Sequence, residues 1–200
     1  MTGLVIGSLG ASRLHEVIAK TKTGYGAGRA NVMADLIVEK LTGVAPERYV
    51  SAAMEHGTQT EAEARAAYEF ITGNAVVQVE PVLHPNIKGA HASPDGLVGD
   101  DAVLEIKCPN SATHIETLLS LGLPSKYVTQ MTWQMLCTNR RIGIFVSYDP
   151  RMPADMRFFC KHIHLDAGLG LELEREVKKF LAELDEKLDA LKAHFRKEAA

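Results

Sequence analysis

Apolar positions follow two different spacings along this chain, and each spacing predicts one kind of element. Apolar residues recur every three or four positions in six segments, which is typical of amphipathic helices. These segments are residues 12–20, 29–41, 51–73, 111–121, 125–138 and a long final stretch from about residue 169. Ser12 stands where a helix N-cap is expected, and Gly43 follows the second helix as a stop signal.

Other segments are rich in β-branched residues and alternate between apolar and polar positions, as strands do. They are residues 74–85, 101–109, 141–150 and 156–166. Helices before and after these segments predict a mixed α/β fold, in which a small central sheet is flanked by helices. The 200 residues contain no repeat and no linker-like stretch, so we expect a single domain over residues 1–200.

The segment SPDGLVGDDAVLEIKCP, residues 93–109, departs from an ordinary core strand. Side chains alternate between the two faces of a strand, so we expect Glu105 and Lys107 on one face and Ile106 on the other. Charged side chains are costly to bury unless they pair or bind something. Asp95 stands in a Pro-Asp-Gly turn that can aim its carboxylate at the same sheet.

Two explanations fit this spacing. In the first, Asp95, Glu105 and the backbone carbonyl of Ile106 offer the hard oxygen ligands that Mg²⁺ prefers. The ammonium of Lys107 then holds and helps deprotonate a water, while the metal stabilises charge on a phosphoryl oxygen. In the second, Glu105 and Lys107 form a surface ion pair worth about 0–1 kcal/mol, and Asp95 only forms a turn.

Composition and charge exclude some classes of protein without selecting one. The chain is 46% hydrophobic and 24% charged, which indicates a folded globular protein. No apolar run approaches the roughly 20 residues that cross a bilayer, and the N-terminus lacks the pattern of a signal peptide. The three cysteines are widely spaced and form no CxxC, so we expect reduced thiols in a cytosolic protein. The net charge of −3 disfavours a protein that coats nucleic acid with its whole surface, but allows a local DNA-binding groove.

Several individual residues admit more than one interpretation. Residues 10–30 form a basic, Gly-rich segment that either contacts phosphates or is a solvated surface loop. His162 and His164 share one strand face, which favours a half-exposed strand over a metal site because no further ligand pair is near. Trp133 is surrounded by methionine and leucine residues and is expected in the core.

Taken together, the motifs resemble those of the PD-(D/E)XK nucleases, specifically the branch of phage lambda exonuclease and the YqaJ viral recombinases. The resemblance covers nearly the whole chain. It is carried by SPDGL and LEIKCP around the active-site strand, by GASRLHEVIAK near the N-terminus, by HGTQTEAEAR and YVTQMTWQMLCT in two helices, and by YDPRM after the following strand. It implies a restriction-endonuclease-like core.

The resemblance also implies roles for individual residues. Asp95 and Glu105 would bind catalytic Mg²⁺, for which Mn²⁺ can substitute, and Lys107 would activate the attacking water. Glu61 would be a further acidic group near the metal, binding it directly or through water, and Gln130 would lie beside the active site and contact the DNA. From the residues alone, Glu61 is one of several exposed helix glutamates, and Gln134 lies on the same helix face as Gln130 and competes for its role.

In the family, a serine at the position of Ser12 lies near the 5′ phosphate of the DNA. A helix N-terminus suits that contact because its N–H groups are free. The family usually has an arginine seven positions earlier, where this chain has Val5. Either Arg13, Lys22 or another cation therefore holds the 5′ phosphate, or recognition of the DNA end is weaker than in the family.

The family activity implied is 5′-to-3′ resection of linear double-stranded DNA, which releases mononucleotides and leaves 3′ overhangs for recombination by single-strand annealing. A ring-shaped homotrimer, a single-strand annealing partner and a cytoplasmic location in a bacterial host of a phage or prophage are implied as well. Two alternatives stay open: an endonuclease or junction resolvase on the same core, and a non-catalytic module that binds DNA ends.

Overall fold

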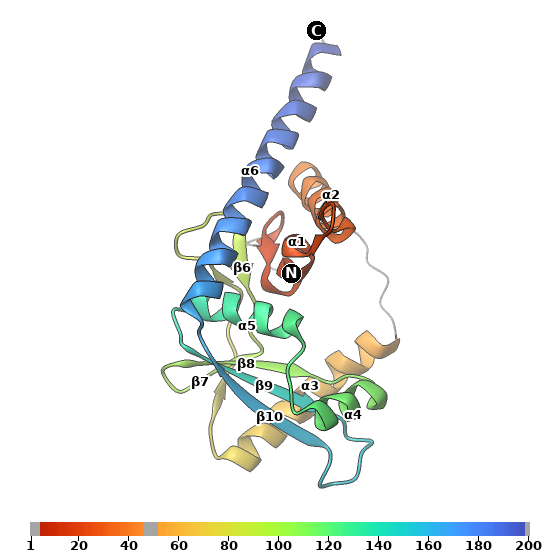
Figure 1. Cartoon of the computed structure of the whole chain (residues 1–200), viewed down its shortest axis with the longest axis vertical. Helices are drawn as coiled ribbons and strands as arrows, with labels where there is room; N and C mark the ends of the chain where they lie inside the picture. The colour runs from red at the N-terminus through yellow and green to blue at the C-terminus, as the bar shows by residue number, and fades with distance from the viewer. Residues whose placement is uncertain (1–4, 46–51, 199–200) are drawn as a thin grey trace.

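The structure is a computed structural model that describes residues 5–45 and 52–198 (Figure 1). Its α-helices are α1 (Leu14–Ile18), α2 (Ala27–Thr42), α3 (Ala52–Thr72), α4 (Ser111–Ser120), α5 (Ser125–Thr138) and α6 (Ala167–Glu198), and the short 3₁₀ helix η2 (Ala11–Arg13) precedes α1. Its strands are β1 (Leu9–Gly10), β2 (Lys20–Thr21), β3 (Gly24–Tyr25), β4 (Val76–Val77), β5 (Val82–Leu83), β6 (Ala90–Ala92), β7 (Gly96–Val98), β8 (Ala102–Lys107), β9 (Ile142–Tyr148) and β10 (Phe158–His164).

The largest sheet has five strands in the order β10-β9-β8-β7-β4. Its two central strands, β8 and β9, are parallel, whereas β7 and β10 pair with them in antiparallel fashion. A second sheet has the order β1-β6-β5, and β2 and β3 form a separate hairpin. The predicted mixed sheet flanked by helices is confirmed.

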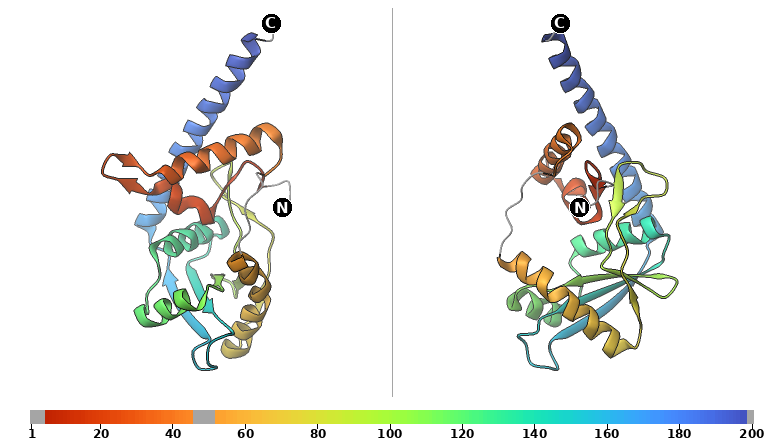
Figure 2. Two further views of the ribbon diagram at one scale, coloured as in Figure 1. Left: turned by 90° about the vertical axis from the view of Figure 1, so that its right-hand side faces the viewer. Right: turned by 180° about the vertical axis from the view of Figure 1, so that it is seen from behind.

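Strand alternation in β8 separates the core from the polar side of the sheet. The buried side chains of Leu104 and Ile106 pack against α3, whose Ala64 and Tyr68 belong to the same apolar cluster. Figure 2 shows α3 on one side of the sheet and α4 on the other. Glu105 therefore faces α5 instead of α3, as its two contacts with that helix require. The predicted alternation is confirmed.

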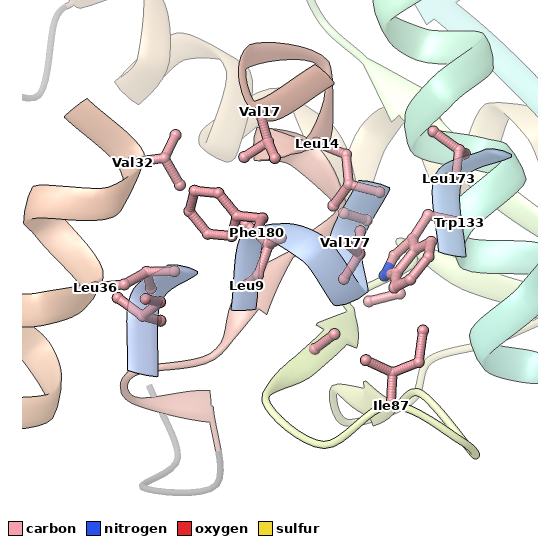
Figure 3. Packing of buried hydrophobic residues seen from close by; sticks show 14 of the residues in the cluster. Leu9, Leu14, Val17, Val32, Leu36, Ile87, Trp133, Leu173, Val177 and Phe180 are labelled. Atoms are coloured by element: carbon pink, nitrogen blue, oxygen red, sulfur yellow. The ribbon is translucent and has the colours of Figure 1, made fainter. Parts of the chain in front are cut away.

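A second apolar cluster joins the N-terminal segment to the C-terminal helix (Figure 3). Val177 and Phe180 of α6 are fully buried in it, together with Val17 of α1 and Val32 of α2. Trp133 of α5 is fully buried in the same cluster, so the prediction that it belongs to the core is confirmed. Beyond this cluster, α6 extends away from the body of the molecule (Figure 1).

Two sequence-based boundaries differ from the structure. Ser12 is not a helix N-cap: it is an exposed residue inside η2, which begins after Gly10. The first helix also ends at Ile18, because Ala19 adopts an extended ψ of 126° and the chain turns into the β2–β3 hairpin. The Gly-rich basic segment thus contains a hairpin whose turn presents Lys22 to solvent.

The segment 74–85, expected as strand, is divided between two sheets. Val76 pairs with β7 in the large sheet, whereas Val82 pairs with β6 in the small one. Pro81 lies between them, and proline cannot donate a ladder hydrogen bond, so the break falls beside it. Gly43 does end α2, with a φ of 71°, as predicted. The predicted start of the third helix, at residue 51, lies outside the described residues.

Candidate active site

A cleft of about 620 Å³ opens between α3, the end of β8 and the beginnings of α4 and α5. Its lining brings together residues from distant parts of the sequence: Glu61, Asp95, Ile106, Lys107, Asn110 and Tyr127. Four of these were candidates from the sequence, so the fold gathers much of the predicted site on one surface.

Asp95 is held against β8 by two hydrogen bonds. Its backbone N–H donates to the carbonyl of Leu104 at 3.0 Å, and its Oδ2 accepts from the N–H of Ile106 at 2.6 Å. Burial, followed by the negative charge of Glu105, raises the pKa of Asp95 to about 8. The turn therefore aims this carboxylate at the active-site strand, as expected, and places it in a crowded acidic environment.

Glu105 has a side chain that is only 1% exposed and does not line the cleft wall. Its Oε1 accepts a hydrogen bond from Nε2 of Gln130 at 2.7 Å and pairs with the ammonium of Lys107. Its Oε2 accepts from Nε2 of Gln134 at 2.5 Å. The interpretation of Glu105 and Lys107 as an exposed surface pair is wrong, because the carboxylate is buried.

Lys107 connects this buried carboxylate to the open cleft. Its side chain is 30% exposed, and its Nζ lies 5.5 Å from the centre of the Tyr127 ring. Burial lowers the pKa of Lys107, but the charges of Glu105 and Asp95 outweigh this and raise the pKa above its ordinary value. The lysine is therefore a positively charged hydrogen-bond donor at the cleft surface.

Glu61 reaches the cleft from α3, on the side opposite α5. Its carboxylate is 35% exposed and accepts a hydrogen bond from Nη2 of Arg65, one helical turn later. Glu61 lines the same cleft as Asp95. The structure thus distinguishes Glu61 from the neighbouring helix glutamates that the sequence left as equal alternatives.

The candidates for 5′-phosphate binding lie apart from the lining of this cleft. Ser12 and Arg13 line a smaller hollow of about 90 Å³, together with Val5. The guanidinium of Arg13 already binds Asp35, at 2.7 Å from Nη1 to Oδ2. Lys22 lies at the exposed hairpin turn.

Two features of the site were missed from the sequence. Gln134 was recognised only as a competitor of Gln130, whereas both amides bind Glu105. Their spacing of four residues on one helix was the available signal. Tyr127, which lines the cleft beside Lys107, carried no signal that separates it from an ordinary helix residue.

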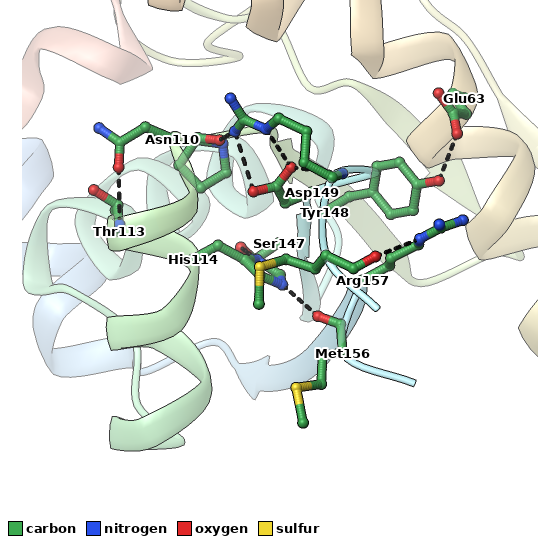
Figure 4. Close-up of polar contacts among 12 residues, drawn as sticks. Glu63, Asn110, Thr113, His114, Ser147, Tyr148, Asp149, Met156 and Arg157 are labelled. Carbon is green, nitrogen blue, oxygen red and sulfur yellow. Dashed lines mark hydrogen bonds and ion pairs between the residues drawn. The ribbon is translucent and has the colours of Figure 1, made fainter. Parts of the chain in front are cut away.

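A polar network fixes the turn that follows Lys107 (Figure 4). Asn110 caps α4 by accepting a hydrogen bond from the N–H of Thr113 at 2.9 Å. Asp149, at the end of β9, is fully buried and accepts hydrogen bonds from Arg151, whose Nη2 also donates to the carbonyl of Pro109 at 2.9 Å. The YDPRM segment therefore holds one wall of the cleft.

Because Asp149 is charged in the folded protein, we expect the fold to lose stability in acid. Burial raises the pKa of Asp149, but hydrogen bonds from Arg151 and Ser111 outweigh it and hold the pKa at about 2, below the ordinary 3.8. The stabilisation is thus complete above about pH 4 and is lost as the pH falls towards 2. We expect Asp149→Asn to lower the free energy of unfolding by about 2 kcal/mol at pH 7, which lowers Tm by about 4–8 °C.

Thermal melts at pH 7 and pH 3 check this prediction, with Asp155→Asn as a control at an exposed position of the same hairpin. The difference in Tm between the Asp149 variant and the native protein should become smaller at pH 3, whereas the control should have the native Tm at both pH values. A gap that stays constant with pH contradicts a charge-dependent contribution.

The carboxylates at the cleft do not form a ready-made metal cage within the described residues. Within residues 5–45 and 52–198, no three side chains of Asp, Glu, His or Cys stand close enough together to form a dedicated metal cage. His162 and His164, which are exposed on β10, do not belong to such a group either. Mg²⁺ usually takes only one or two carboxylates and completes its shell with waters and substrate phosphates. The carboxylates of Asp95 and Glu105 and the carbonyl of Ile106, with Glu61 on the facing wall of the cleft, fit that pattern.

The mixed sheet, with a carboxylate-bearing turn leading into the strand that carries Glu105 and Lys107, defines the PD-(D/E)XK nuclease fold. The model of the YqaJ-like viral recombinase domain matches residues 6–141, and the chain belongs to this family. A comparison with curated proteins gives no match.

Solved structures agree with this assignment. The alkaline exonuclease LHK-Exo from Laribacter hongkongensis is 46% identical to the chain, with a TM-score of 0.90 over 96% of this chain and 95% of that one. LHK-Exo in complex with dAMP is 45% identical, with a TM-score of 0.92 over 98% and 96% of the two chains. A phage related exonuclease from Haemophilus somnus 129PT, 14% identical with a TM-score of 0.73 over 94% and 96%, shares the fold. These findings support a nuclease that acts on DNA in recombination.

None of the described helices is both long enough and apolar enough to span a membrane.

Proposed function

We propose that residues 1–200 form one nuclease domain that degrades one strand of linear double-stranded DNA from its 5′ end. The reaction depends on Mg²⁺, with Mn²⁺ as a substitute, releases mononucleotides and leaves 3′ overhangs for single-strand annealing. The observation that carries this proposal is the cleft itself, in which Asp95, Lys107 and Glu61 meet beside the buried Glu105.

Asp95, Glu105 and the carbonyl of Ile106 are the groups that would hold Mg²⁺, with Glu61 adding a ligand directly or through water. Glu105 can take part although it is already bonded, because a carboxylate offers about four lone-pair sites. When bound, Mg²⁺ supplies positive charge that stabilises the phosphoryl oxygens and makes a water more acidic.

The protein's own residues then orient the reaction. Lys107 can hold the attacking water and stabilise the negative charge that develops as the water loses its proton. Gln130 keeps the Glu105 carboxylate in place by its hydrogen bond of 2.7 Å. Ser12 and Lys22 would contact the DNA backbone outside the cleft, and Arg13 would do so only by sharing its bond with Asp35.

Relatives support the exonuclease assignment over an endonuclease. The similar LHK-Exo is an alkaline exonuclease, and one of its structures contains dAMP, a mononucleotide such as the proposed reaction would release. The family resemblance further supports a ring-shaped homotrimer that encloses the DNA, a single-strand annealing protein as partner, and a cytoplasmic location in a bacterium that carries the phage or prophage.

Digestion of matched linear and circular duplex DNA tests this function. With Mg²⁺, linear DNA labelled at its 5′ ends should release labelled mononucleotides at once, whereas DNA labelled at its 3′ ends should retain the label on a single strand. Excess EDTA should stop the release, and added Mg²⁺ should restore it. Cleavage of covalently closed circular DNA at a comparable rate would show an endonuclease instead, and label released first from 3′ ends would reverse the polarity.

A further inference from the structure

The side chain of Gln134 is fully buried and contacts Glu105, one of the proposed metal ligands. Its Nε2 donates to Oε2 of Glu105, and its exposed fraction is 0%. Among the described residues, the amide oxygen Oε1 of Gln134 has no hydrogen-bond partner. The reversed amide would place that oxygen against a carboxylate oxygen, so the contact with Glu105 alone determines how this side chain is oriented.

Gln130 and Gln134 each hydrogen-bond a different oxygen of the Glu105 carboxylate. They stand one turn apart on α5, so both amides face the same strand. Gln130 binds Oε1 and Gln134 binds Oε2, which leaves the carboxylate little freedom to rotate about its terminal bond. Lys107, which lines the cleft, pairs with Oε1.

Amides are suited to this task because they orient a carboxylate without neutralising it. A second lysine or arginine at position 134 would form an ion pair and compete with a cation for Glu105. A neutral donor satisfies one oxygen of the buried carboxylate and leaves its charge for a metal. Groups that hydrogen-bond metal-binding carboxylates in this way commonly change metal affinity by about 10–100-fold when they are removed.

We propose that Gln134 is a positioning residue that fixes the second oxygen of the Glu105 carboxylate and thereby sets the affinity of the site for Mg²⁺. This inference rests on the proposed function, because it requires that Glu105 binds the metal. It extends that function by separating the roles of the two glutamines: Gln130 binds the oxygen that Lys107 also binds, whereas Gln134 binds the other oxygen and prevents rotation.

A purely structural role for Gln134 predicts a different outcome. If the amide only fills space in the core, Gln134→Met, which has nearly the same volume and no polar atoms, should keep both stability and metal binding. If the amide positions Glu105, the same variant should keep the fold and lose metal affinity. Gln134→Asn keeps an amide but is one methylene shorter, so it no longer reaches Oε2 and should weaken metal binding as much.

Calorimetric titration with Mn²⁺ in the absence of DNA measures metal affinity directly. Thr132→Val is the matched control, since Thr132 is 1% exposed on the same helix and does not hydrogen-bond Glu105. We expect Gln134→Met to raise the Kd for Mn²⁺ by about tenfold and the control to leave it unchanged. The Mg²⁺ concentration for half-maximal cleavage should rise by the same factor, while KM for DNA stays constant.

Each result bears on a different claim. Native protein that neither binds Mn²⁺ nor cleaves DNA overturns the proposed function and this inference together. Native protein that does both, with Gln134→Met and Gln134→Asn matching it in Kd, overturns the positioning role and leaves the function intact. If Gln134→Met fails to fold, the Kd of Gln134→Asn decides in the same way, and a native value there overturns the inference.

Discussion

Lys107→Ala should lower the rate of linear DNA cleavage by about 10³-fold while leaving DNA binding nearly unchanged. The lysine is the positively charged donor at the cleft surface, so it is the group best placed to hold the attacking water. Its removal takes away a stabilising charge where negative charge develops. DNA affinity depends mainly on many phosphate contacts, of which this lysine is at most one.

The fold should survive this substitution. Glu105 loses its ionic partner, but Gln130 and Gln134 continue to donate to both of its oxygens. The loss of rate can then be assigned to chemistry if the melting temperature stays within a few degrees of the native value. Single-turnover cleavage of a 5′-labelled duplex, with binding measured in Ca²⁺, separates the two steps.

Lys126→Ala is the matched control. Lys126 also lines the cleft, with its Nζ 4.8 Å from the centre of the Tyr127 ring, but it does not contact Glu105. We expect this variant to weaken DNA binding modestly and to keep the single-turnover rate. Equal rates for Lys107→Ala and the native protein would refute the role given to Lys107, and an equal loss in both variants would indicate a general charge effect.

The active-site strand could be predicted from sequence because its chemistry follows from local rules. Alternation along β8 is enough to place Glu105 and Lys107 on one face, and a Pro-Asp-Gly turn is enough to suggest the direction of Asp95. The resemblance to the family was required to add Glu61, because its helix alone gives no reason to prefer it.

The parts that could not be predicted depend on tertiary packing. Gln134 contacts Glu105 only because α5 packs against β8, and the periodicity of α5 does not specify that packing. Ser12 was expected to cap a helix because serine favours that position, but the chain tightens into η2 and leaves it exposed. The division of residues 74–85 between two sheets likewise depends on which strands are available as partners.

Asp95→Asn should abolish metal-dependent cleavage, with a loss of about 10³-fold, and yet should not destabilise the fold. Asn keeps a side-chain oxygen that can accept the N–H of Ile106, so the turn stays anchored to β8. It removes a carboxylate that burial and the nearby Glu105 both disfavour in its charged form. With a pKa of about 8, this carboxyl must take up a proton when the chain folds at pH 7, and Asn avoids that cost. A gain of about 1 kcal/mol raises Tm by about 2–4 °C.

Asp95→Asn is thus expected to raise stability and to lower activity, and this combination makes the variant informative. A residue that serves only the turn should keep both stability and activity in this variant, because Asn preserves the hydrogen bond to Ile106. A metal ligand placed in an acidic site should instead gain stability and lose activity. Melting curves, Mn²⁺ titration and cleavage of linear DNA measure the three quantities on one sample, and Asp100→Asn provides an exposed carboxylate in the adjacent turn as control. Retained Mn²⁺ affinity in Asp95→Asn would exclude Asp95 as a ligand, because the amide nitrogen does not bind Mn²⁺ and the charge that attracts the cation is gone.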